Sequence, residues 1–310
     1  MASKASFSLR LFELIFGLAA SQLKGRKFPK AQRQLENRKY PSPALPPAYL
    51  RKRVHVQEQT IHGQAVYILS PRQDGKPIHV IYLHGGAYVY PLSFTHWLVI
   101  QEILKHTGAS FTVPTYPLAP EHTYHETFPL LDEVYRQILQ EHPDDQIVLC
   151  GDSAGAGLAL AAVMDWRDRG LPLPHNLVLF SPWLDITMSN PQAAQAETQD
   201  GMLGIPGLVQ CGEWWAGEDD PHSPKLSPIF GDLAGLPPIA VFIGTHDLFY
   251  PDVQMLAQKV EQSGGEIHLQ VAPGGMHDYV MATFTPEAQA AYRYLAGVVG
   301  SRAAQGKGWI

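Results

Sequence analysis

The chain has 310 residues, 45% of them apolar, which is enough to bury the core of one large α/β domain with an insertion. The net charge of −6 argues against nucleic acid as a partner. Residues 1–53 nevertheless carry 12 Lys and Arg against only Glu13 and Glu36. We expect this basic arm to lie on the acidic remainder of the chain or on an anionic surface. Cys150 and Cys211 form no disulfide framework or metal motif, so a reducing cytoplasm is the simplest location.

The N-terminal stretch imitates a signal peptide, because Lys4 and Arg10 precede an apolar run over residues 11–20. Glu13 interrupts that run, which is also too short to span a bilayer, so no integral membrane span is expected. Four apolar residues at helical spacing predict an amphipathic helix that packs on the body of the protein: Phe7, Leu11, Leu14 and Leu18. Residues 1–50, ending in a proline-rich linker, are therefore predicted to be a cap segment, with a targeting segment as the alternative.

Predicted strands begin at Arg53. Residues 53–57 and 64–69 form a hairpin, and Ile78–Leu83 is a continuous apolar run of the kind found in parallel sheets. This run leads directly into His84-Gly85-Gly86-Ala87. Two glycines after a buried strand let the backbone approach a ligand and present N–H groups, as an oxyanion hole requires.

Helical and strand patterns then alternate up to residue 150, which predicts a parallel sheet built from βαβ units. His122 and His125 beside Glu126 give the order H-x-x-H-E, which is neither H-E-x-x-H nor its inverse. We therefore predict no metal site.

The segment from Ile147 to Gly157 is the strongest motif. Apolar residues give a buried strand, Gly151 and Gly155 flank Ser153, and a helical run follows at once. This is G-x-S-x-G in the strand–turn–helix context that it requires. The sharp turn exposes the serine hydroxyl, and the first N–H groups of the helix point at whatever it attacks. Ser153 is the predicted nucleophile, and the alternative is a small-residue turn with an uninvolved serine.

Residues 186–236 lose the strand pattern, so we predict an insertion that covers the site and divides a core of residues 51–185 and 237–310. The strand pattern returns at Ile239–Ile243, which leads to Asp247. A last strand, Ile267–Val271, leads to His277.

Ser153, Asp247 and His277 each follow a different parallel strand, and the carboxyl ends of such strands meet in one crevice. His277 would take the serine proton and return it to the leaving alcohol, while Asp247 orients the imidazole. Asp252 stays the alternative acid, because it lies in the loop after the same strand. Other candidates are less well placed: His246 adjoins Asp247, Asp185 ends the strand before the insertion, and Asp152 belongs to the serine turn.

These motifs, taken in order, resemble the hormone-sensitive-lipase-like group of α/β-hydrolase carboxylesterases. The resemblance covers about Ile78 to Val280 and rests on the following segments: His84-Gly85-Gly86-Ala87, Tyr116 to Glu121, Gly151-Asp152-Ser153-Ala154-Gly155, Ser181-Pro182-Trp183, Leu226-Ser227-Pro228, Gly235-Leu236-Pro237-Pro238, Asp247-Leu248 and Gly275-Met276-His277. It implies an eight-stranded, mostly parallel sheet flanked by helices, with a helical cap made from the N-terminal segment and the insertion. It also implies a Ser-Asp-His esterase without a cofactor.

By the same resemblance, backbone N–H groups of Gly85, Gly86, Ala87 and Ala154 form the oxyanion hole. Ala87 stands where the family often has a third glycine, and Ala156 where a glycine often extends the serine motif. Both are small, so we expect an altered fit rather than lost chemistry.

The predicted function is hydrolysis of small-molecule esters with short- to medium-chain acyl groups, by a monomer or homodimer. Two alternatives stay open. A non-catalytic small-molecule receptor of this fold commonly lacks the histidine, and His277 is present. An amidase, peptidase or acyltransferase would use the same triad, although the chain has no room for the large gating domain of an oligopeptidase.

Overall fold

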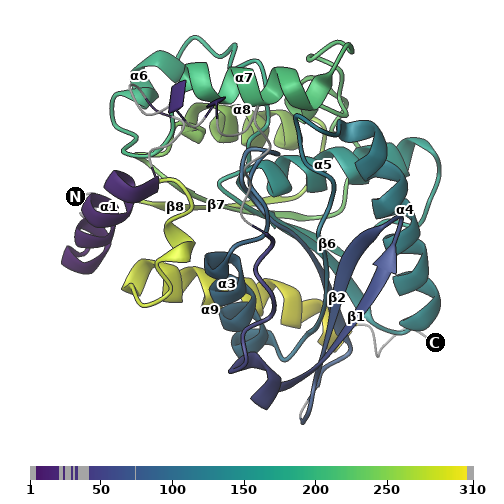
Figure 1. Cartoon of the computed structure of the whole chain (residues 1–310). Helices are drawn as coiled ribbons and strands as arrows, with labels where there is room; N and C mark the ends of the chain where they lie inside the picture. The colour runs from purple at the N-terminus through teal and green to yellow at the C-terminus, as the bar shows by residue number, and fades with distance from the viewer. Residues whose placement is uncertain are drawn as a thin grey trace.

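The computed structural model describes residues 5–20, 24, 29–30, 32–33, 42–73 and 75–305. Its described part is built around one eight-stranded sheet in the order β1-β2-β4-β3-β5-β6-β7-β8 (Figure 1). The strands are β1 Val54–Ile61, β2 Gln64–Pro71, β3 Ile78–Leu83, β4 Ser110–Pro114, β5 Gln146–Asp152, β6 Asn176–Phe180, β7 Ile239–Gly244 and β8 Ile267–Ala272. Pairing is antiparallel for β1–β2 and β2–β4 and parallel from β4 to β8. The predicted α/β-hydrolase architecture, with a mostly parallel sheet, is therefore confirmed.

Helices cover both faces of this sheet (Figure 1). They are α1 Phe7–Ala20, α3 Phe94–Thr107, α4 Tyr124–Glu141, α5 Ser153–Asp168, α6 Ala193–Glu197, α7 Ile205–Ala216, α8 Tyr250–Gln262 and α9 Pro286–Gln305, with short 3-10 turns η3 Leu50–Lys52, η4 Pro228–Phe230 and η5 Tyr279–Met281. No helix in the described ranges combines the length and apolar character needed to cross a bilayer.

The central strands are buried on both faces, which explains their unbroken apolar runs. Every residue of β3, β5 and β7 is buried. Alternate residues point to opposite sides, so Ile147 and Leu149 join the core under α4, α5 and α8, whereas Val148 and Cys150 join the core over α3 and α9.

Helix α1 forms as predicted, but it packs with a different face. Phe7, Leu11 and Leu14 are exposed, whereas Leu9 is fully buried. The ring of Phe12 lies 5.8 Å from that of Phe284. The expected stripe was wrong because apolar residues occur on more than one side of this helix, and their spacing fits two faces equally well. Leu18 lies in the helix, but its side chain is outside the described part.

The start of α1 is fixed to the body by polar contacts. Ser6 donates from its backbone N–H and its hydroxyl to the carboxylate of Glu287 in α9, at 2.6 and 2.8 Å. Glu13 lies 3.7 Å from His246, in the loop after β7. Helix α1 therefore lies beside the loops that follow β7 and β8 and the start of α9.

The segment 186–236 contains α6, α7 and η4 and, within the described chain, no strand. It lies with α8 at one end of the molecule, at the top of Figure 1. Trp215 of α7 is buried and stacks on Tyr88 of the loop after β3, with ring centroids 4.3 Å apart and planes 2° apart. This stack fixes the helical segment to the glycine-rich loop.

Candidate active site

Ser153 lies at the sharp turn between β5 and α5. Its φ of 51° is in the left-handed region, which is strained for a residue other than glycine. A Cβ on Gly151 would lie 2.5 Å from the backbone of Gly155, and one on Gly155 would lie 2.1 Å from the carbonyl oxygen of Leu83. The two glycines therefore allow the turn to pack directly on the end of β3.

The loops after β7 and β8 bring Asp247 and His277 to this serine. His277 Nε2 lies 3.0 Å from Ser153 Oγ, and His277 Nδ1 lies 3.1 Å from both carboxylate oxygens of Asp247. All three residues are buried, with Ser153 the most accessible at 7%. The structure thus brings together the three residues that the sequence singles out, in the order that proton transfer requires.

The two other candidate acids, Asp252 and Asp185, do not contact His277 through any hydrogen bond or ion pair of the described residues. Asp252 is in the first turn of α8, where its Oδ1 accepts a 2.6 Å hydrogen bond from Asn190, and burial raises its pKa to about 6. Asp185 accepts hydrogen bonds from Thr187 and Ser189 in its own loop. The predicted alternatives to Asp247 are therefore occupied in local structure and do not face His277.

The loop after β3 forms the opposite wall. Gly86 and Ala87 have φ values of 119° and 52° and line the cavity beside Ser153. Gly85 differs, because its N–H donates to Asp152 Oδ2 at 2.9 Å. This N–H is already engaged, so we no longer propose Gly85 as an oxyanion donor. Gly86, Ala87 and Ala154 at the start of α5 remain the candidate donors.

Asp152 has a role that the sequence did not reveal. It is fully buried, accepts a 2.5 Å hydrogen bond from Tyr82 and lies 3.3 Å from His96 Nε2. Burial raises the pKa of Asp152, but the neighbouring His96 and the hydrogen bonds outweigh this and hold the pKa below its usual value. The Asp152 carboxylate therefore anchors Gly85 and with it the loop of candidate oxyanion donors.

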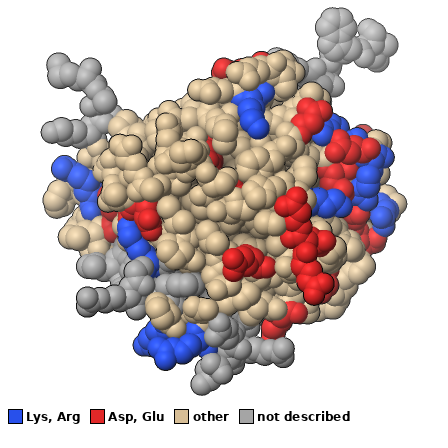
Figure 2. All heavy atoms as spheres, turned by 90° about the horizontal axis from the view of Figure 1, so that it is seen from above, with Lys and Arg blue, Asp and Glu red and all other residues tan. Residues whose placement is uncertain are grey.

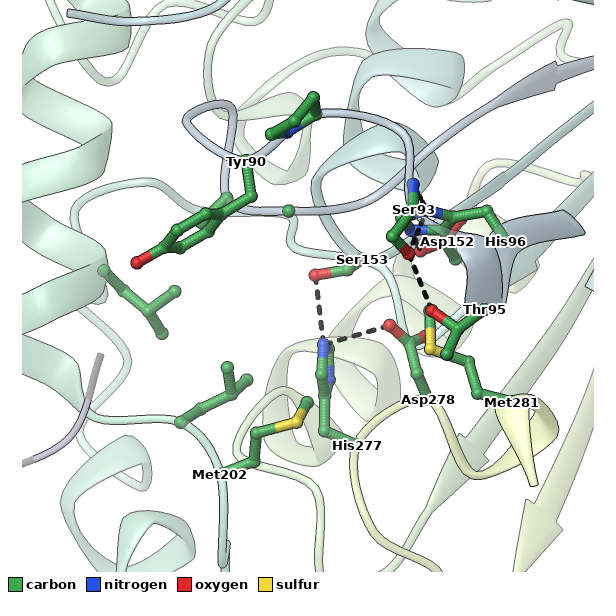
Figure 3. Close-up of a pocket in the computed structure, with 15 residues that line it drawn as sticks. Tyr90, Ser93, Thr95, His96, Asp152, Ser153, Met202, His277, Asp278 and Met281 are labelled. Carbon is green, nitrogen blue, oxygen red and sulfur yellow. Dashed lines mark hydrogen bonds and ion pairs between the residues drawn. The ribbon is translucent and has the colours of Figure 1, made fainter. Parts of the chain in front are cut away.

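Asp278 is a second residue that sequence reasoning missed. Its Oδ2 lies 3.3 Å from His277 Nε2, on the nitrogen that also faces Ser153, and its Oδ1 has no partner within the described chain (Figure 3). Burial lowers the pKa of His277, but Asp278 and Asp247 outweigh it and raise that pKa to about 10. The only sequence signal for Asp278 is that it directly follows the histidine.

A cavity of about 220 Å³ opens beside Ser153. In Figure 3, Tyr90 and Met202 lie on one side of the Ser153–His277 pair, and Thr95, His96 and Met281 lie on the other. Leu203 and Leu208 from the segment 186–236 add to the apolar lining. No described residue of the N-terminal arm is among the lining residues. The predicted cap segment also includes residues 1–4, 21–23, 25–28, 31 and 34–41, which lie outside the described part.

Four side chains of metal-binding type line this cavity, but their donor atoms do not form a group that could hold one ion: His96, Asp152, His277 and Asp278. Among the described residues, groups of three or more His, Cys, Asp or Glu with ligand-like spacing occur only at His79, His142 and Asp145, away from Ser153. His122 pairs with Glu126, and His125 pairs with Asp219.

Comparison with known proteins identifies the family. A family model described as alpha/beta hydrolase fold matches residues 80–281. The chain is 31% identical over 221 residues to an esterase of Acinetobacter venetianus. The aligned region covers 70% of this chain and 73% of that protein. It is 31% identical over 217 residues to an acetyl-hydrolase of Streptomyces hygroscopicus, with coverages of 70% and 72%. The chain therefore belongs to the α/β-hydrolase fold family.

A solved structure has the same fold. The fold matches that of a hormone-sensitive lipase from a metagenome library with a TM-score of 0.81 and 24% identity, over 97% of this chain and 100% of that chain. This likeness confirms the fold, and the resemblance to the hormone-sensitive-lipase-like group stays a prediction from the motifs.

Proposed function

We propose that this carboxylic ester hydrolase acts through a covalent acyl-enzyme on Ser153. The observation that carries the proposal is the continuous chain of contacts from Asp247 through His277 to Ser153, at the edge of a largely apolar cavity. The esterase and acetyl-hydrolase relatives support ester hydrolysis as the reaction.

In the first half-reaction, Ser153 Oγ attacks the ester carbonyl carbon while His277 Nε2 takes the hydroxyl proton. The carbonyl oxygen becomes an oxyanion, which the N–H groups of Gly86, Ala87 and Ala154 would stabilise. The C–O bond to the alcohol then breaks, and His277 returns the proton to the departing alcohol. In the second half, water attacks the acyl carbon, His277 takes its proton and passes it to Ser153 Oγ, and the carboxylic acid leaves.

The substrates we propose are uncharged esters with short to medium acyl chains. Met202, Leu203, Leu208 and Met281 give the cavity an apolar wall, and its volume of about 220 Å³ limits the chain that it can hold. Seen from above, most of the surface is uncharged, and the charged side chains near its centre are acidic (Figure 2). Each buried methylene gains roughly 0.8 kcal/mol, or about fourfold in kcat/KM, until the cavity is full.

We also propose that the N-terminal arm and the segment 186–236 together form the cap, as the predicted domain boundaries of 1–50, 51–185, 186–236 and 237–310 require. Lys24 donates to the backbone carbonyls of Glu197 and Asp200, the first at 3.0 Å. Asp200 Oδ1 in turn accepts from the N–H groups of Met202 and Leu203, which line the cavity. The arm would thus stabilise the loop that forms the apolar wall.

A panel of p-nitrophenyl esters from acetate to palmitate, with matched anilides, tests the function. We expect kcat/KM to rise with chain length, stop rising at medium chains, and be far lower for every anilide. Preferential anilide turnover would indicate an amidase, and tight binding of esters without turnover would indicate a receptor.

A cytoplasmic location and a monomeric or homodimeric state stay predictions. The buried free thiols of Cys150 and Cys211 are compatible with a reducing compartment.

A further inference from the structure

A second group of ligand-type side chains lies near the amino-terminal ends of the central strands, whereas Ser153 follows the carboxyl end of β5. His79 is the second residue of β3, and His142 and Asp145 lie in the turn between α4 and β5. The strand register pairs His79 with Ile147, five residues before the end of β5. At about 3.3 Å per residue, the cluster lies roughly 16 Å along the strand from the active site.

His79 presents a nitrogen that the fold leaves unused. The side chain is fully buried, and its Nδ1 has no hydrogen-bond partner within the described part of the chain. Its Nε2 lies 2.8 Å from Thr112 Oγ1 on β4, which fixes the orientation of the ring. A buried polar atom without a partner is costly, so an unpaired nitrogen held at a fixed position requires an explanation.

His142 and Asp145 face this histidine. The two imidazole rings have centroids 4.4 Å apart, and His142 Nδ1 lies 3.0 Å from Asp145 Oδ2. One ligand atom from each of the three residues falls within 4.8 Å of the others. His142 and Asp145 are only partly buried, so they can adjust their side chains, and water can reach the remaining coordination position.

We propose that His79, His142 and Asp145 bind one divalent transition-metal ion, with zinc as the ion that the donors fit best. Two imidazoles and one carboxylate suit zinc and other divalent transition-metal ions, whereas calcium and magnesium require oxygen donors. Zinc binds such atoms at about 2.0–2.2 Å, so modest movement of the two half-buried side chains brings all three donors to one ion. The site would tie β3 to the turn before β5 and act on stability, independently of Ser153.

Zinc and cobalt titrations of the full-length, tag-free, chelator-treated protein test this proposal. We expect one ion per chain by calorimetry and a melting temperature that rises with zinc concentration. His142→Ala and Asp145→Asn should each weaken binding at least about tenfold, because even loss of an outer-shell partner usually costs that much. His222→Ala is the matched control, since this exposed histidine also lies beside an aspartate, 3.3 Å from Asp220, but no third donor joins them within the described ranges.

Two half-buried positions are used because replacing the buried His79 could prevent folding. The proposal is overturned if the unchanged protein binds no zinc. It is also overturned if zinc binds His142→Ala and Asp145→Asn as tightly as the unchanged protein, as a site at His277 would allow. Equal loss of binding in His222→Ala would show scattered surface sites and would contradict it as well.

Discussion

The imidazole of His277 lies between two carboxyl groups that face different nitrogens. Asp247 faces Nδ1 at 3.1 Å, and Asp278 faces Nε2 at 3.3 Å. An acid on Nδ1 orients the ring and stabilises its protonated form, while one on Nε2 lies where the serine proton must arrive. The two residues should therefore affect catalysis differently.

Asp247→Asn should lower kcat on an aryl acetate by about 10⁴, because the ring would be held in the wrong tautomer. Asp252→Asn is the matched control: its carboxyl bonds to Asn190 and not to His277, so kcat should stay near that of the unchanged protein. Steady-state kinetics on both variants shows whether Asp247 or Asp252 is the acid of the triad. A larger loss in Asp252→Asn would transfer the acid role to that residue.

The pH dependence follows from the pKa of His277. The neutral ring is the base, and a raised pKa means that the protonated ring persists to higher pH, so kcat/KM should fall on acidification with a midpoint above the usual value near 6.5. Asp278→Asn removes an acidic group beside Nε2, so the midpoint should move to lower pH. A pH–rate profile of both proteins measures the shift. An unchanged midpoint in Asp278→Asn would mean that Asp278 carries no charge over this range.

At the level of elements, the contact between α5 and β3 holds the serine turn. Gly155→Ala should destabilise the protein by about 1–3 kcal/mol, since its Cβ would lie 2.1 Å from the carbonyl oxygen of Leu83. Gly297→Ala, on an exposed turn of α9 with nothing within 4 Å, should be neutral or stabilising by up to about 1 kcal/mol. Urea midpoints measure both changes. Equal midpoints for the two variants would show that the close approach does not constrain the turn.

The contact between the N-terminal arm and the segment 186–236 should affect the preference for longer acyl chains. Lys24→Ala should lower kcat/KM for hexanoate more than for acetate, because the loop carrying Met202 and Leu203 loses its support from the arm. Lys30 is exposed on the same arm, so Lys30→Ala should leave kcat/KM unchanged for both hexanoate and acetate. Kinetics on the two p-nitrophenyl esters measures the ratio. An unaltered chain-length preference in Lys24→Ala, and in a protein lacking residues 1–50, would make the arm a targeting segment or anchor.

For the whole molecule, the sequence predicts what depends on local pattern and chain order. Buried strands, the serine turn and the order of Ser153, Asp247 and His277 are visible because the ends of parallel strands converge at one edge. It does not reveal which face of α1 packs, because apolar residues lie on two sides. Nor does it reveal that Asp152 engages the N–H of Gly85, or that His79 meets His142, because those contacts depend on three-dimensional packing between distant segments.

The central claim is that Ser153 forms the acyl-enzyme, and covalent trapping tests it most directly. The protein is treated with an aryl organophosphonate, digested and examined by mass spectrometry, with Ser153→Ala treated in parallel. We predict one adduct, on Ser153, with loss of esterase activity in step with labelling, and in Ser153→Ala neither adduct nor activity beyond a residue several orders of magnitude lower. An adduct on another residue, or turnover by Ser153→Ala within about tenfold of the unchanged protein, would contradict the claim.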